Sequence, residues 1–93
     1  MERTTIQQIL EAAPGVESGD EGFSVADEHL ASIYLGGKGA ATVLSELVRI
    51  KLSDDWIEAE QKDRTLHFVA YEPVLAVSLR RPRDPDRKAR TGF

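Results

Sequence analysis

Residues 40–52 read AATVLSELVRIKL, and the interpretation of the whole chain depends on this stretch. It lies between the glycine-rich run Gly36–Gly39 and the polar segment Ser53–Asp55. When the stretch is plotted at about 100° per residue, its apolar side chains cover an arc of roughly 200°, twice the ~100° stripe of a one-sided surface helix. The sequence therefore predicts a central helix over residues 40–52 that needs a second partner surface besides one small sheet.

A second, shorter helix is predicted near the N-terminus, over residues 6–13. Thr5 and Gln8 have the spacing of a capping box, and apolar residues recur at helical spacing until Pro14 and Gly15. Residues 15–22, which are rich in glycine and acidic side chains, predict a flexible loop.

Two strands are predicted between this loop and the central helix. Residues 23–26 alternate apolar and polar side chains, and residues 29–35 carry a strand-like apolar run, so the two favour a β-hairpin. A helix over residues 26–34 is the competing interpretation, because the apolar residues there also suit one helical face.

Three further strands are predicted after the central helix, over residues 56–61, 65–71 and 74–80. Their connections are too short for parallel crossovers, so they predict an antiparallel meander. The expected fold is α+β, in the order α-β-β-α-β-β-β, with helices packed on an antiparallel five-stranded sheet. Residues 1–80 form the expected single domain, and the basic, proline-containing residues 81–93 form a flexible tail.

The charge is divided unevenly along the chain. The net charge is −4, but residues 80–93 hold six basic and two acidic residues (+4), which leaves −8 for residues 1–79. An acidic body repels phosphate backbones, so nucleic-acid binding is expected only through the tail. The chain has no cysteine and no apolar run as long as a membrane span, which favours a cytoplasmic protein without membrane insertion.

No group of residues has the pattern of a catalytic, metal or cofactor site. Gly36–Gly39 lies between a strand and the predicted helix, as phosphate-binding loops do, but it lacks the P-loop pattern and favours a flexible turn. His29 and His67 have no metal-ligand partners at suitable spacing, and the acidic pairs lie beside turns. We therefore expect no enzymatic activity and no cofactor.

Trp56 is the residue that most suggests an interface. It opens a predicted strand and shares its parity with Glu58 and Glu60, and an aromatic side chain on an otherwise acidic face is typical of a binding surface. A core tryptophan at the end of the central helix is the equally weighted alternative.

The order of elements and two short phrases resemble the roadblock (dynein light chain) family. The phrases are Ala13-Pro14-Gly15-Val16, at the end of the first helix, and Pro73-Val74-Leu75-Ala76-Val77, in the last strand. The resemblance covers residues 4–80, although the acidic loop and the tail depart from the family pattern. It implies a dimer in which the elements at 40–52 and 56–61 pair across a two-fold axis, with a scaffold or regulatory role towards a Ras-like small GTPase.

The sequence thus favours a non-enzymatic, homodimeric protein-binding module that acts as a scaffold or regulator. The alternative is a winged-helix DNA-binding regulator with residues 41–52 as the recognition helix, which the acidic body disfavours. The expected dimer or partner interface consists of Val43, Leu44, Val48, Ile50, Trp56 and Glu58.

Overall fold

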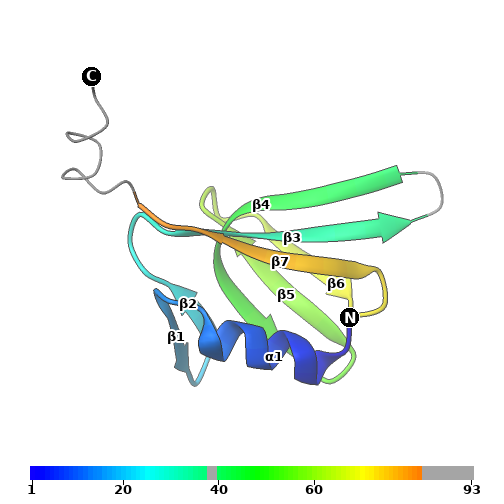
Figure 1. The fold of residues 1–93 in the computed structure, drawn as a ribbon, viewed down its shortest axis with the longest axis horizontal. Coiled ribbons are helices and arrows are strands. Elements are labelled where there is room, and N and C mark those ends of the chain that lie inside the picture. Colours follow the sequence, from blue (N-terminus) through cyan, green and yellow to red (C-terminus); the bar gives the residue numbers. More distant parts are fainter. Residues whose placement is uncertain (38–39, 83–93) are drawn as a thin grey trace.

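The computed structural model describes residues 1–37 and 40–82 and consists mostly of β-structure. One N-terminal helix, α1 (Arg3–Ala12), precedes seven strands that form one curled antiparallel sheet, open on one side like half of a barrel (Figure 1). The strands are β1 (Val16–Gly19), β2 (Gly22–Val25), β3 (Leu30–Gly37), β4 (Ala40–Leu52), β5 (Trp56–Gln61), β6 (Leu66–Ala70) and β7 (Val74–Arg80).

The predicted fold class is wrong, because the predicted central helix is the longest strand of the sheet. Residues 40–52 form β4, so the order α-β-β-α-β-β-β and the five-stranded sheet are both replaced by one helix and seven strands. The physical reason lies in the second half of the stretch. From Val48 to Leu52 apolar and charged residues alternate, and Ile50 is buried while Lys51 is exposed. A period of two suits a strand with one face in the core.

Irregularities within β4 conceal this period over the full stretch. The pairing with β3 shifts register between Leu47 and Leu44, and the pairing with β5 shifts between Leu47 and Arg49. Glu46 has a φ of 56°, which lies in the left-handed region. After each bulge, the residues that face the core change from odd to even positions or the reverse. Over the full stretch the apolar positions therefore resemble one arc of a helix.

The bend in β4 makes the sheet curl. Its C-terminal half pairs with β2 on one edge and β5 on the other, whereas its N-terminal half pairs with β3 and extends with it as a protruding hairpin (Figure 1). β7 pairs with β3, and β6 pairs with β5. The three predicted C-terminal strands are present, but the meander is wrong at its second connection, because β7 joins β3 and not β6.

The strands predicted at 23–26 and 29–35 are present as β2 and β3, and the competing helix over 26–34 is absent. They do not form a hairpin with each other. β2 instead forms a hairpin with β1, which occupies part of the predicted acidic loop, and Gly22 supports the tight turn with a φ of 106°. A Cβ atom on Gly22 would also lie 2.8 Å from the carbonyl oxygen of Ile50, so the close approach of β2 to β4 requires glycine.

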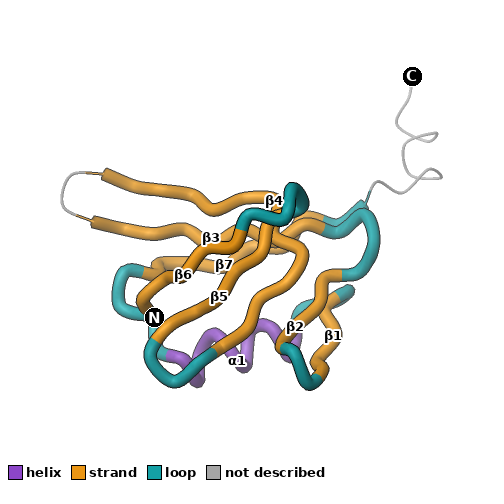
Figure 2. The backbone as a smooth tube through the Cα atoms, turned by 180° about the vertical axis from the view of Figure 1, so that it is seen from behind, coloured by secondary structure: helices purple, strands orange, loops and turns teal. Residues whose placement is uncertain are grey.

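The helix α1 packs on the inner side of the curl (Figures 1 and 2). Ile6 and Leu10 are its fully buried residues and join the core cluster. The predicted capping box is wrong, since the helix begins earlier, at Arg3, after Glu2, which makes no side-chain capping bond. The amino group of Met1 instead donates hydrogen bonds of 2.9 Å to the carbonyl oxygens of Tyr71 and Val74, which ties the start of the helix to the β6–β7 turn.

The core is a single cluster between α1 and the inner face of the sheet. Its buried members are Ile6, Leu10, Phe23, Ala31, Ile33, Leu47, Ile50, Ile57, Ala59, Val69 and Val74. No helix in the part of the chain that the structure describes is long and apolar enough to cross a membrane.

Candidate functional site

The predicted interface residues do not lie on one surface. Ile50 is 1% exposed and belongs to the core, and Leu44 packs against the core from a partly buried position. Val43 lies exposed on the protruding hairpin, beside Tyr34 of β3. Val48 is half-buried at the bulge of β4. These residues therefore cannot form the single helical interface that the sequence predicted.

Trp56 and Glu58 lie together on β5, on the outer face of the sheet. Trp56 is 44% exposed, so it is not the core tryptophan of the alternative interpretation. Its indole Nε1 donates a 3.2 Å hydrogen bond to the carboxylate of Glu58, which also accepts one from the hydroxyl of Ser53. β5 has a neighbour on each edge, β4 and β6, so the pairing of residues 56–61 with a second subunit is excluded in this fold.

Exposed apolar residues of β6 share the outer face with Trp56 of β5. The register places Trp56 opposite Ala70 and Glu58 opposite Phe68, with Leu66 two residues along β6. Phe68 is 64% exposed and Leu66 is 47% exposed. Val69, the residue after Phe68, points to the opposite side, into the core, and is 7% exposed. We call the set Trp56, Leu66, Phe68 and Ala70 the β5–β6 face.

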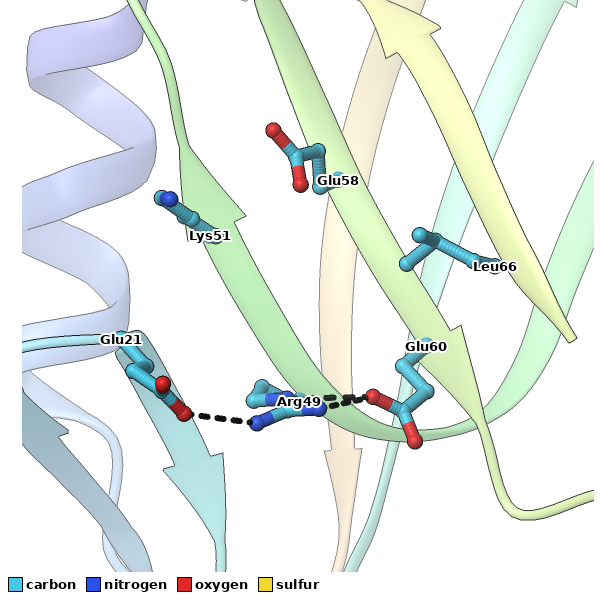
Figure 3. A pocket seen from close by; sticks show the side chains of 6 residues that line it. All are labelled: Glu21, Arg49, Lys51, Glu58, Glu60 and Leu66. Carbon is cyan, nitrogen blue, oxygen red and sulfur yellow. Dashed lines mark hydrogen bonds and ion pairs between the residues drawn. The ribbon is translucent and has the colours of Figure 1, made fainter. Parts of the chain in front are cut away.

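A row of charged residues borders the β5–β6 face on β4 and β5. These residues line a depression of about 230 Å³ together with Leu66 (Figure 3). Arg49 lies between two of its acidic residues: its Nε donates to Glu60 at 3.1 Å and its Nη1 pairs with Glu21 at 3.3 Å. The hydrogen bond and the charge of Glu60 raise the pKa of Arg49 above its usual value.

An ion-pair network dominates this depression, because Arg49 pairs with both Glu21 and Glu60. Lys51 and Glu58 complete the charged lining, and none of the lining residues is a hydroxyl, thiol or imidazole nucleophile. Paired charges at the rim of an apolar surface favour correct orientation of a partner more than they add affinity. The network therefore suits the polar border of an interface.

The turn between β5 and β6 is well defined. The Gln61 amide donates to the Thr65 carbonyl and the Arg64 amide to the Gln61 carbonyl, both at 2.8 Å. The side chain of Asp63 accepts a 2.9 Å hydrogen bond from the Thr65 amide, and this bond lowers the pKa of Asp63. The start of β6 is thus held in one register against β5.

The two histidines that the sequence offered as candidate site residues do not come together in the structure. His67 shares a 2.8 Å hydrogen bond with the side chain of Gln61, and His29 lies 3.2 Å from the carbonyl oxygen of Asp27. Within residues 1–37 and 40–82 there is no cluster of three potential metal ligands. Two residues of the glycine run, 38 and 39, and tail residues 83–93 lie outside the described residues.

Sequence reasoning missed Leu66 and Phe68 as surface residues. They alternate with His67 and Val69, and the alternation alone does not say which of the two sets is buried. The informative signal was on the neighbouring strand, because Leu66 and Phe68 lie opposite Glu60 and Glu58. Unneutralised carboxylates avoid the core, so that face of the hairpin had to be the outer one.

Comparisons with known proteins add no assignment to this geometry. No family model matches the chain, and neither the curated proteins nor the solved structures contain a match to it.

Proposed function

We propose that this protein is a non-enzymatic protein-binding module whose partner contacts the β5–β6 face. One observation carries the proposal: three large apolar side chains, Trp56, Phe68 and Leu66, are exposed on one outer surface, with Phe68 between the other two. A single exposed apolar residue is ordinary, but a contiguous group with two aromatic members is typical of a binding site.

The composition of this face fits a protein partner. Tryptophan and other aromatic residues are enriched among the side chains that contribute most to protein–protein affinity, and polar residues commonly surround them. The Arg49–Glu60 ion pair and the neighbouring Glu58 form such a polar border on one side of the apolar residues. The exposed trio of Tyr34, Val43 and Leu75 lies elsewhere, over β3, β4 and β7, and no ion pair among residues 1–37 and 40–82 borders it.

The winged-helix alternative does not fit the described residues. It needs helices at 26–34 and 41–52, and both stretches lie in strands or turns. The identification of a Ras-like small GTPase as the partner depended on the fold of the roadblock resemblance, which the strand at 40–52 contradicts. The GTPase is therefore not part of the proposal.

The proposal is tested by capture of partners from a native lysate, with the partner quantified by mass spectrometry. We expect Trp56→Ala and Phe68→Ala each to reduce capture of the same protein about 10-fold or more, as removal of a strongly contributing interface residue does. Leu75→Ala is the matched control, because Leu75 is as exposed as Phe68 (64%) and lies on β7.

Circular dichroism on each variant checks that the fold is unchanged. If both aromatic substitutions leave capture unchanged while Leu75→Ala abolishes it, the binding surface lies over β3 and β7 and the proposal is wrong.

A further inference from the structure

We propose that the open edge of β6 pairs with β6 of a second copy of this chain, in an antiparallel register centred on Phe68. The sheet then continues through a two-fold axis, and two β5–β6 faces join into one. This inference rests on the proposed function, because the joined face is the surface offered to the partner. Three features of β6 support it.

The first feature is the direction of the backbone groups along β6. The turn fixes the phase of the ladder, since Gln61 and Thr65 form a hydrogen-bonded pair. In an antiparallel ladder hydrogen-bonded pairs alternate with non-bonded pairs. His67 and Val69, opposite Ala59 and Ile57, are therefore directed towards β5. The N–H and C=O groups of Leu66, Phe68 and Ala70 are directed away from β5, along the open edge.

The second feature is the lack of protection at this edge: among the residues that the structure describes, β6 pairs with β5 alone. Exposed edges are commonly shielded by charged side chains, proline or very short strands. β1, the edge strand beside β2, has four residues and includes Glu17. β6 reads LHFVA, without an acidic residue, lysine, arginine or proline. An apolar edge of this kind is a template for another strand.

The third feature is charge complementarity under two-fold symmetry. A register centred on Phe68 places Leu66 opposite the partner copy's Ala70 and brings the two Phe68 rings side by side. The same register brings the turn before β6, which holds Arg64, near the partner copy's turn after β6, which holds Glu72. Both side chains are exposed, and the symmetry makes this pair twice. Opposite charges at the two ends of the strand pair favour that register over its alternatives.

The strand that pairs with β6 comes from a second copy of the chain, because the edge of β6 is complementary to itself. An isologous interface uses the same patch on both subunits, so each element needs its counterpart at the symmetric position. Here the outward backbone groups, the aromatic residue at the centre and the two opposite charges at the ends all satisfy that condition.

Sedimentation equilibrium over a concentration series tests the inference. We expect wild type to approach twice the 10.3 kDa of the single chain, and Ala70→Pro to remain at 10.3 kDa with an unchanged circular dichroism spectrum. Proline removes an N–H that points out of the monomer, which an edge strand tolerates. His67→Pro is the control, since it removes an N–H bonded to β5 and should lower the melting temperature.

Charge reversal provides a test that does not depend on proline. Arg64→Glu and Glu72→Arg should each weaken the dimer about tenfold, because two attractive pairs become repulsive. The double variant, in which the two charges are exchanged, should restore it. A dimer of wild-type affinity in either single variant overturns the register.

Failure of this inference differs from failure of the proposed function. A wild-type chain that stays at 10.3 kDa throughout, or an Ala70→Pro variant that dimerises as wild type does, overturns the β6 pairing. Neither result changes the effect of Trp56→Ala on capture, because Trp56 lies on β5, away from the open edge. Trp56→Ala should conversely still dimerise.

Discussion

The two halves of β4 belong to one strand but have opposite environments. The C-terminal half has neighbours on both edges, and its residues Leu47 and Ile50 are fully buried. The N-terminal half has one neighbour, β3, and Val43 within it is 48% exposed. Residues of similar apolarity therefore serve the core in one half and the surface in the other. The difference arises from topology, because burial depends on which strands lie beside a residue.

The largest expected difference between the halves concerns a buried charge. Ile50→Glu should unfold the protein, because an unpaired carboxylate in the core costs several kcal/mol, a large share of a typical total stability of about 5–15 kcal/mol. Val43→Glu should change the free energy of unfolding by less than about 0.5 kcal/mol, as surface substitutions usually do. Circular dichroism and urea titration measure both. A folded Ile50→Glu protein would contradict the placement of this half in the core.

A smaller difference is expected when side chains are truncated. Leu47→Ala should lower the free energy of unfolding by about 2–5 kcal/mol, because Leu47 is fully buried and its removal leaves a cavity. Leu44→Ala should cost less, since Leu44 is only partly buried at the edge of the core cluster. Equal losses in urea titrations of the two variants would show that the halves are packed alike.

The same comparison explains which parts of the fold could be predicted from the sequence. The strands at 56–61 and 74–80 were predicted with their observed bounds, because turn residues separate runs of strand-forming residues. The strand at 40–52 was not predicted, because two bulges disturb its alternation. Its apolar arc of ~200° on a helical wheel, too wide for a surface helix, was the sign that the helical period is wrong. A helical wheel places Lys51 within that apolar arc, whereas in the structure it is an exposed residue of an alternating strand.

The candidate site was predicted only in part. Trp56 and Glu58 are on the outer face as expected for a surface feature, because Trp56 shares its parity with two glutamates. Leu66 and Phe68 required the register of β6 against β5, which places them opposite Glu60 and Glu58, and the alternation within β6 alone does not contain this information. The pairing of β3 with β7 is non-local and joins residues 39 to 50 positions apart.

The smallest expected effect concerns the joint between the two halves. Glu46 has a φ of 56°, a conformation that costs a residue with a side chain about 1–2 kcal/mol and that glycine adopts freely. Glu46→Gly should therefore raise the free energy of unfolding by up to about 1 kcal/mol, after the greater entropy that glycine loses on folding is subtracted. Ser45→Gly is the matched control: Ser45 is also exposed and adjacent in β4, but its φ is not positive, so glycine there should lower stability by about 0.5–1 kcal/mol. Urea titrations with unchanged slopes would report both shifts as changes in midpoint. If both substitutions destabilise the protein equally, the left-handed joint at Glu46 carries no strain and the bend of β4 must be maintained by its neighbours alone.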